Sequence, residues 1–332
     1  MLGMTVKSTN NDNSKEYLEL SVIVPTYDEG ENIDALLDRL EPALSKLAIA
    51  YEIIFVDDGS TDNTVETVRA RRRSNSRICL IELSRNFGKE NAITAGFDFS
   101  KGDAVICMDA DLQHPPELIE TLIGLWREGF EVVYTRRKTR NDGTWLRGIL
   151  GKAFYHIYNK LSDAPIPPDA GDFRLLDRSV VQALCRLRET SRFMKGLYSW
   201  VGFRQIGVEF VPEERHKGKS TWNLWSLWNY AVEGITSFGT IPLRIWTYVG
   251  SLIALLSFVY AIFLVVRTIV WGADVPGFAS LIVLVLFFGG IQLITLGIFG
   301  EYLGRVYQEA KGRPLYIVSK QEGLKDRIDA QG

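Results

Sequence analysis

The sequence predicts an α/β domain built on a mainly parallel sheet and followed by two membrane-spanning helices. Between residues 18 and 135, short apolar runs alternate with amphipathic segments at helical spacing. This alternation is typical of repeated strand–helix–strand units, which place helices on both faces of a parallel sheet. From residue 241 to residue 300 the chain is almost uniformly apolar, which is long enough for two bilayer crossings of about 20 residues each.

Five strands and four helices are expected in the first part of the chain. The strands are continuous apolar runs rather than alternating ones, which favours a sheet that is buried on both faces. Asn32 and Asp62 lie at the starts of helical patterns and are expected to act as N-caps. The expected strands span residues 21–24, 52–56, 78–83, 104–108 and 131–135, and the expected helices span residues 32–47, 62–73 and 90–99 and begin again at residue 116.

The apolar C-terminal part divides into two runs, residues 245–267 and 278–299, joined by a short connector. Basic residues flank the outer ends of these runs, whereas only Arg267 marks the connector. The positive-inside rule therefore places both chain ends and the α/β domain in the cytoplasm, with a multi-pass membrane anchor. A helical hairpin buried in a soluble core is the alternative. The flanking basic residues are Arg244, Arg305, Lys311 and Arg313.

Composition narrows the remaining possibilities. The formal net charge is −2, without the basic excess that indicates nucleic-acid binding. The cysteines lie far apart, and Cys79 and Cys107 fall in apolar runs, which favours buried free thiols. Residues 1–17 are polar and are interpreted as a disordered tail. Residues 222–237 carry tryptophans at three-residue spacing and are expected to form a helix in the membrane interface or against the first domain.

Asp109-Ala110-Asp111 follows the fourth expected strand and is a candidate metal site. Two carboxylates at alternate positions of a turn can face one hard cation. Mg²⁺ and Mn²⁺ typically take one or two protein carboxylates and complete their shell with phosphate and water oxygens. A cation here would neutralise the charge that builds on a departing diphosphate. Asp-x-Asp alone also occurs in many solvated turns, so the interpretation depends on its position and its neighbours.

Two further acidic clusters follow the first and second expected strands. Residues 25–29 (PTYDE) offer an aromatic ring and two acids for a base and its ribose, and residues 57–62 (DDGSTD) offer acids for a nucleobase or ribose hydroxyl. Each cluster also has a simpler interpretation, as a polar loop with a capping acid or as a turn with an N-cap. Because the carboxyl ends of parallel strands meet at one edge, the three clusters together favour a nucleotide site.

These runs together resemble glycosyltransferase family 2. The resemblance lies in residues 21–29 (SVIVPTYDE), 56–62 (VDDGSTD), 84–89 (SRNFGK), 108–117 (MDADLQHPPE), 171–174 (GDFR) and 214–220 (ERHKGKS). It implies a GT-A, Rossmann-like catalytic domain. With two membrane helices at the C-terminus, the chain is most similar to the polyisoprenyl-phosphate glycosyltransferases, the branch that includes dolichyl-phosphate mannose synthases and bacterial undecaprenyl-phosphate glucosyltransferases of the GtrB type.

Matched by motif, the resemblance assigns the donor and metal residues. Asp109 and Asp111 lie at the diphosphate, with Asp111 the main ligand of Mg²⁺ or Mn²⁺ and Gln113 assisting. Asp28 stands where asparagine is commoner in the family and receives no role, and residues 219–222 (KSTW) depart from the family's usual small-Ser-Lys-aromatic order. The implied donor-binding residues are Pro25, Tyr27, Glu29, Asp58, Asp109 and Asp111, and Lys89 is expected to join them. Arg215 and Lys219 are also expected to bind the donor phosphates, because both are basic and Gly218 lies between them.

The resemblance implies a lipid phosphate as acceptor. With a second pKa near 6, a phosphate monoester is largely ionised at neutral pH and needs charge compensation more than it needs a base. Arg136 and Arg147 are the candidates for binding it, because a guanidinium binds phosphate bidentately. Arg137 and Arg140 are interpreted as solvated surface residues. Asp172 is expected near the acceptor, either as a base or as an orienting group, in a single in-line displacement with inversion.

The expected function is transfer of a hexose, glucose from UDP-glucose, to a polyprenyl phosphate by a self-associating membrane enzyme. A mannosyltransferase that uses GDP-mannose and a non-catalytic membrane scaffold are the alternatives. A processive polysaccharide synthase is disfavoured because the sequence lacks a Gln-x-x-Arg-Trp motif. The expected domains are a tail at 1–17, a catalytic domain at 18–215, a loop and juxtamembrane helix at 216–240, two membrane helices at 241–303 and a cytoplasmic tail at 304–332.

Overall fold

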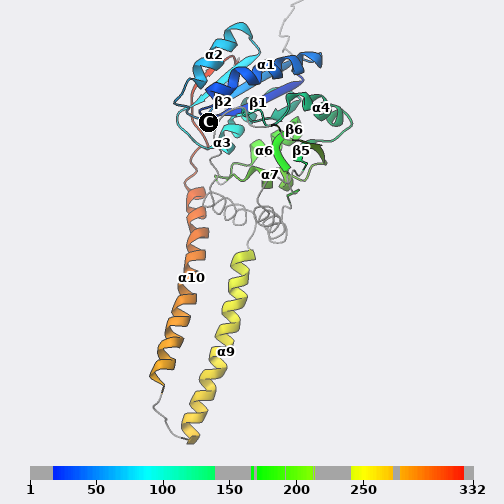
Figure 1. Cartoon of the computed structure of the whole chain (residues 1–332). Helices are drawn as coiled ribbons and strands as arrows, with labels where there is room; N and C mark the ends of the chain where they lie inside the picture. The colour runs from blue at the N-terminus through cyan, green and yellow to red at the C-terminus, as the bar shows by residue number, and fades with distance from the viewer. Residues whose placement is uncertain are drawn as a thin grey trace, which may run out of the picture.

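In the computed structural model the described residues are 18–138, 166–167, 170–190, 192–211, 213, 241–271 and 277–324. They form an α/β domain from which two long helices project side by side (Figure 1). Several predicted features lie outside these residues: the N-terminal tail, Arg140, Arg147, the segment with Arg215 and Lys219, and the tryptophan-bearing segment at 222–237.

Within the described residues, an eight-stranded sheet has the order β7-β5-β6-β4-β1-β2-β3-β8. Strands β4, β1, β2 and β3 run parallel, β5 is parallel to β7, and β6 and β8 run antiparallel to their neighbours. The prediction of a mainly parallel sheet is therefore confirmed. The strands are β1 (Leu20–Thr26), β2 (Tyr51–Asp57), β3 (Ile78–Leu83), β4 (Ala104–Cys107), β5 (Val132–Arg137), β6 (Ala170–Asp177), β7 (Gln205–Phe210) and β8 (Val318–Glu322).

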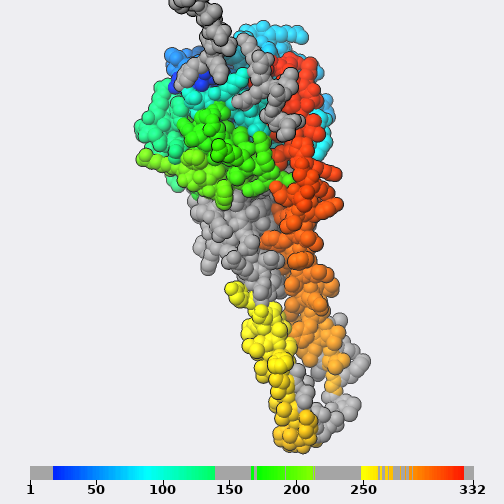
Figure 2. Space-filling view, turned by 180° about the vertical axis from the view of Figure 1, so that it is seen from behind, coloured from blue at the N-terminus to red at the C-terminus, as the bar shows by residue number. Residues whose placement is uncertain are grey.

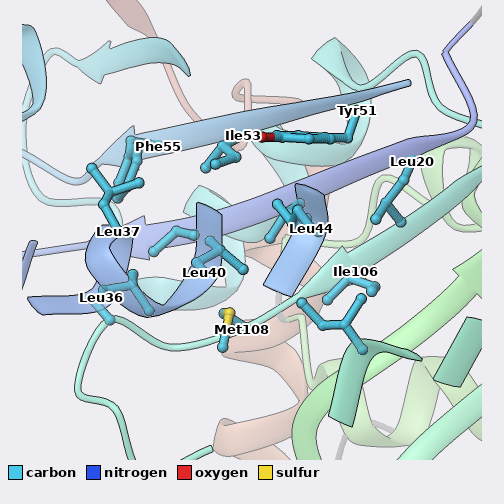
Figure 3. Packing of buried hydrophobic residues seen from close by; sticks show 14 of the residues in the cluster. Leu20, Leu36, Leu37, Leu40, Leu44, Tyr51, Ile53, Phe55, Ile106 and Met108 are labelled. Atoms are coloured by element: carbon cyan, nitrogen blue, oxygen red, sulfur yellow. The ribbon is translucent and has the colours of Figure 1, made fainter. Parts of the chain in front are cut away.

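Helices cover both faces of the sheet, as predicted from its continuous apolar strands. On one face, α1 packs leucines at positions 36, 37, 40 and 44 against Ile53 and Phe55 of β2 and Ile106 of β4 (Figure 3). Each fully buried leucine contributes about 1.5–3 kcal/mol through the hydrophobic effect. On the other face, α3, α6 and α7 cover Ile54 and Val105. The helices are α1 (Gly30–Lys46), α2 (Thr64–Ser74), α3 (Lys89–Phe99), the 3₁₀ turn η1 (Pro116–Leu118), α4 (Ile119–Arg127), α6 (Arg178–Arg186) and α7 (Met194–Trp200).

The predicted helix caps need correction. Asn32 does not cap α1: it lies inside the first turn, and its side-chain amide donates to Glu29 Oε2 at 2.5 Å. Asp62 lies one residue before the N-cap of α2 and accepts from the Thr64 amide at 3.0 Å. Its other oxygen accepts from the amide of Gly30, at the start of α1. One carboxylate therefore satisfies backbone donors at two helix starts, which no local sequence pattern could indicate.

Helices α9 (Ile241–Trp271) and α10 (Phe278–Ala310) contain 31 and 33 residues, so they span about 46 and 50 Å, against a hydrocarbon core of about 30 Å. Many of their large apolar side chains, such as Ile269 and Leu293, are exposed. This does not fit a hairpin buried in a soluble core. Among the described residues, Phe287–Ala310 is long and apolar enough to cross a membrane, and Tyr248–Tyr260 of α9 is a shorter apolar stretch. The second crossing stays a prediction.

The chain returns from α10 to the α/β domain and adds β8 to the edge of the sheet beside β3. Figure 2 shows this C-terminal segment in red along the side of the domain. The Ser84 amide donates to the Ile317 carbonyl at 2.9 Å, and the Tyr316 hydroxyl donates to Asp98 Oδ2 at 2.7 Å. The cytoplasmic tail expected at 304–332 therefore begins as the end of a helix and then joins the domain. Its charged strand carries no apolar run that would have indicated this pairing.

Candidate active site

The acidic clusters lie where the predicted parallel sheet requires, at the carboxyl ends of β1, β2 and β4. Because β6 runs antiparallel to β4, its first residues also lie at this edge, and Gly171 and Asp172 join the clusters there. The motif at residues 171–174 indicates Asp172 as a site residue, but the strand that carries it was not predicted. A strand that starts with glycine and aspartate and carries a central arginine has a weak β pattern.

Asp28, to which the family resemblance assigns no role, ties the first cluster to the second. Its backbone has φ of +53°, a left-handed conformation that aspartate tolerates better than most residues. Asp28 Oδ1 accepts from the amides of Thr61 and Asp62 at 2.7 and 3.3 Å, and its own amide donates to Ser60 Oγ at 2.9 Å. The loops that follow β1 and β2 are therefore held to each other by a network of local hydrogen bonds.

Asp58 connects the second cluster to the loop after β3. Its two carboxylate oxygens accept from the amides of Phe87 and Gly88 at 2.7 and 2.8 Å. Burial raises the pKa of Asp58 more than these hydrogen bonds lower it. Gly59 has φ of +78°, and a Cβ there would lie 2.8 Å from the backbone carbon of Arg85. The turn therefore requires glycine, both for its conformation and for the close approach of the two loops.

Lys89, at the start of α3, joins two acids from different strands. Its Nζ lies 2.6 Å from Asp109 Oδ1 and 2.8 Å from Asp172 Oδ2. The side chains of Lys89, Asp109 and Asp172 are 41, 26 and 35 % exposed, so a substrate can reach them. Desolvation opposes the charge on Lys89, but Asp109 and Asp172 hold its pKa well above the usual range. The Lys89 ammonium group is therefore charged at neutral pH.

Asp172 lies in a second group of charges that the sequence-based analysis missed. Burial opposes its ionisation, yet Lys89 and Lys195 hold its pKa well below the usual range. Beneath it, the Arg174 guanidinium lies 3.8 Å from the centre of the Tyr198 ring and donates to the Gly171 carbonyl at 2.6 Å. Burial, and then the charge of Asp172, raise the pKa of Glu90 to about 8. Asp172 is therefore an ionised group with nearby cations, beside an acid that holds its proton.

The turn that contains Asp111 is strained. Leu112 has φ of +61°, which costs a branched residue about 1–2 kcal/mol, and its side chain is buried in the core. Asp111 Oδ1 accepts from the Gln113 amide at 3.1 Å. The Gln113 side-chain oxygen accepts from Arg137 Nη2 at 3.2 Å. Arg137 was expected to be merely solvated; it is exposed, but it contacts this turn.

His114 is the residue after Gln113, and it is only 3 % exposed. Its ring packs against Phe173 and Phe210 with centroids 5.4 and 5.1 Å away. Neither ring nitrogen has a hydrogen-bond partner among the described residues. Burial lowers the pKa of His114, which favours the neutral ring. Ligand atoms from Asp109, Asp111 and His114 lie within 4.8 Å of one another, so the residues present fit a divalent cation.

The structure brings Lys89, Asp109, Asp111 and Asp172 together at the carboxyl edge of the sheet. Arg136 lies nearby at the end of β5, but it forms an ion pair with Glu209 of β7. Of the residues expected at the nucleoside, Tyr27 is 48 % exposed, while Glu29 accepts from Asn32. The roles of these residues stay predictions. His114 could have been suspected from the sequence, because it lies within the most specific matched run, at residues 108–117.

Comparison with known proteins places these observations in context. Residues 21–185 match glycosyl transferase family 2. An uncharacterized glycosyltransferase of Synechocystis sp. is 52 % identical over 307 residues, covering 92 % of this chain and 96 % of its own. A prophage-derived bactoprenol glucosyl transferase of Shigella flexneri is 43 % identical over 303 residues, covering 91 % of this chain and 98 % of its own.

Among solved structures, a mannosyltransferase of Pyrobaculum calidifontis in complex with GDP-Man and Mn²⁺ has a TM-score of 0.44 and 20 % identity. It covers 66 % of this chain and 64 % of its own. A mannosyl-3-phosphoglycerate synthase of Rubrobacter xylanophilus has a TM-score of 0.47 and 16 % identity, covering 70 % of this chain and 75 % of its own.

Proposed function

The chain belongs to glycosyl transferase family 2, and we propose that it transfers glucose from UDP-glucose to a polyprenyl phosphate with inversion at the anomeric carbon. That it is a glycosyltransferase follows from the family and from relatives that match it over more than nine tenths of its length. Donor, acceptor and stereochemistry are the proposed part. The observation that carries the proposal is the bridge from Lys89 to Asp109 and Asp172 beside Asp111.

The relatives support a lipid acceptor. Several that are 42–43 % identical are called bactoprenol glucosyl transferases, from Shigella flexneri and its phages. They match this chain over 91–92 % of its length, which is enough to include α9 and at least most of α10. Long apolar chains leave a bilayer only at a cost of about 0.8 kcal/mol for each CH₂. An enzyme with such an acceptor must therefore come to the membrane, and the two apolar helices are suited to hold it there.

On the donor side, we assign the end of β1 and the loops after β1 and β2 to the nucleoside, through Pro25, Tyr27, Glu29 and Asp58. Asp109 and Asp111, assisted by Gln113, would hold Mg²⁺ or Mn²⁺. A cation bound there would neutralise charge on the departing nucleoside diphosphate. Lys89 has an exposed ammonium group beside the same carboxylates and is placed to contact a diphosphate oxygen. Arg215 and Lys219 are proposed to bind the same phosphates.

On the acceptor side, the lipid phosphate needs no base because it is already ionised at neutral pH. Asp172 is a poor proton acceptor, since neighbouring cations hold its pKa well below the usual range. We therefore assign it an orienting role, in which it positions Lys89 and keeps the amine charged. Arg136 and Arg147 are proposed to bind the acceptor phosphate. For Arg136 this requires partial release from its exposed partner Glu209, which is inexpensive because surface ion pairs contribute only about 0–1 kcal/mol.

The proposed organisation keeps the predicted boundaries, with residues 18–215 as the catalytic domain and residues 241–303 as two crossings of the inner membrane. The catalytic domain and both chain ends would lie in the cytoplasm, where nucleotide-sugars are made. Helices α9 and α10 bury little of each other, and many of their large apolar side chains stay exposed. We therefore propose that the protein self-associates through its membrane segment.

The test is incubation of the full-length protein in vesicles that contain polyprenyl phosphate with radiolabelled UDP-glucose, GDP-mannose or UDP-N-acetylglucosamine. Mn²⁺ or Mg²⁺ is present, and the lipid fraction is extracted. We expect label in the lipid from UDP-glucose only, and only when the acceptor is supplied. Label from GDP-mannose instead would replace the proposed donor. Absence of label from all three would contradict transfer to this acceptor and favour a non-catalytic scaffold.

A further inference from the structure

We propose that His114 supplies the third protein ligand, through a ring nitrogen, to the divalent cation that Asp109 and Asp111 hold. The inference rests on the metal site of the proposed function, but it goes beyond the aspartates and the glutamine that the family resemblance implies. It assigns a binding role to His114, whose burial without a hydrogen-bond partner among the described residues is otherwise costly.

The buried imidazole of His114 lacks hydrogen-bond partners for its two ring nitrogens among the residues that the structure describes. A neutral histidine ring carries one N–H donor and one acceptor nitrogen, and buried groups of this kind are nearly always hydrogen-bonded. His114 is 3 % exposed, and both nitrogens lack a partner among the described residues. Phe173 and Phe210 fix the ring by packing against it without offering any polar atom. A cation would satisfy one of the two nitrogens.

The His114 ring also lies close to the two carboxylates. Each of His114, Asp109 and Asp111 offers one ligand atom, and these three atoms lie within 4.8 Å of one another. Ligands on opposite sides of a Mg²⁺-sized ion are about 4.2 Å apart, given bond lengths of about 2.1 Å. Small side-chain movements therefore close this set around an ion. All three side chains come from one six-residue segment, 109–114, whose turn contains Leu112 in the left-handed conformation.

The described residues beside the His114 ring also leave its nitrogens open to a ligand. A Cβ at Gly171 would lie 3.6 Å from His114 Nε2 and 3.0 Å from Thr135 Oγ1. A larger residue at the start of β6 would press on Thr135 and come into ordinary contact with the ring, so glycine keeps this side of Nε2 free of a side chain. Gln113, by contrast, already uses its side-chain oxygen to accept from Arg137 and its amide to donate to Asp111. Both ring nitrogens of His114, however, lack a hydrogen-bond partner among the described residues.

A nitrogen ligand has a measurable consequence. Imidazole, a softer ligand than a carboxylate, binds the first-row transition-metal dications better than it binds Mg²⁺, and Mn²⁺ is the weakest binder of that series, whereas carboxylates accept both Mn²⁺ and Mg²⁺. His114 should therefore favour Mn²⁺ over Mg²⁺ at this site. Replacing it with glutamine, which offers an oxygen, is expected to reduce that preference and to weaken Mn²⁺ binding by at least about tenfold.

The experiment is pulsed electron paramagnetic resonance of Mn²⁺ bound to the full-length protein in the presence of UDP. The protein is produced with ¹⁴N-histidine or ¹⁵N-histidine, because a directly bound imidazole gives a nuclear coupling that changes with the isotope. The chain has three histidines, so His114→Gln is compared with a double variant, His156→Gln with His216→Gln, which keeps only His114. Gln113→Ala is the matched neighbour control, and Mn²⁺ and Mg²⁺ affinities are titrated for each protein.

We expect an isotope-sensitive coupling in the wild type, in Gln113→Ala and in the double variant, and its loss in His114→Gln. If His114→Gln does not fold, the double variant still decides, because His114 is its only histidine. Mn²⁺ that binds without a histidine nitrogen, in protein that still labels lipid, would overturn this role and leave the transfer reaction standing. Failure of wild-type protein to label lipid would overturn the proposed function, whatever the coupling shows.

Discussion

Two neighbouring parts of the candidate site are equally rich in acids but differ in what those acids contact. In the loop clamp, which we define as the loops after β1, β2 and β3, Asp28, Asp58 and Asp62 accept hydrogen bonds from backbone amides. In the charged cluster, which we define as Lys89, Asp109, Asp111, His114 and Asp172, acids face an ammonium group or lie beside an unpartnered imidazole.

This difference distinguishes acids that hold the loops in place from acids that can take part in the reaction. A carboxylate whose oxygens accept backbone hydrogen bonds is already satisfied, so its main effect is to hold loops in place. Carboxylates that face a partly exposed lysine can exchange that partner for a substrate or a cation. The two kinds of acid look alike in the sequence, because Asp-rich turns after strands serve both purposes. Four experiments are expected to distinguish them.

Removal of divalent cations is expected to have the largest effect. Chelation should reduce transfer by about 10³-fold, because a cation contributes several kcal/mol to stabilising the charge of the leaving group. Added Mn²⁺ should restore the rate. The loop clamp contains no proposed metal ligand, so the thermal unfolding of the domain should change little. Full transfer activity after chelation would show that the charged cluster does not depend on a cation.

Substitution Lys89→Met is expected to have the second-largest effect on transfer. It removes the ammonium group that lies between Asp109 and Asp172, and loss of one such charged donor at a reacting centre typically costs 10²–10³-fold in turnover. Steady-state kinetics with labelled donor measures the effect, and Lys46→Met removes a lysine from an exposed position in the last turn of α1 as the control. Equal activity of the two variants would remove Lys89 from the chemistry.

Substitution Asp58→Asn tests the loop clamp. An amide group cannot accept from both Phe87 and Gly88, so one backbone donor loses its partner, at a cost of about 1–3 kcal/mol in the free energy of unfolding. We expect a lower Tm and weaker donor binding, with kcat affected less than KM. Asp38→Asn, at a side chain that is 64 % exposed, serves as the control. A drop in kcat with unchanged stability would instead place Asp58 in the chemistry.

Substitution Glu90→Gln is expected to have the smallest effect, visible as a pH dependence. Burial, and then Asp172, raise the pKa of Glu90 from 4.5 to about 8, so the folded protein holds an extra proton between these values. The free energy of unfolding therefore falls as pH rises through this window. The variant should flatten that slope, and its Tm should exceed that of the wild type more at pH 8.5 than at pH 5. Parallel Tm curves would rule out this titration.

The sequence predicted the parallel half of the fold well because its strands are fully buried and therefore continuously apolar. All of β1 to β5 were located, with small differences at their ends. Strands β6, β7 and β8 were missed. β6 carries Asp172 and Arg174 for the site rather than an apolar pattern, and β8 is a charged edge strand that reaches β3 only after the chain has passed through α9 and α10.

For the site, sequence motifs identified the residues at the strand ends but not their partners. Asp58 and Asp111 both follow strands and resemble each other locally, yet long-range contacts give them different surroundings. The importance of His114 depends on the aromatic rings of Phe173 and Phe210, which come from β6 and β7. Such contacts between distant segments lie beyond any local pattern, so the unpartnered imidazole became apparent only in the folded chain.

The most direct test of the central claim is transfer of labelled glucose from UDP-glucose to polyprenyl phosphate in vesicles, measured side by side for the wild type, Asp111→Asn and Asp58→Asn. The account predicts label in the lipid from the wild type, reduced but measurable label from Asp58→Asn at saturating donor, and essentially none from Asp111→Asn. Equal loss in both variants, or full activity of Asp111→Asn, would contradict the division between a loop clamp and a reacting charged cluster.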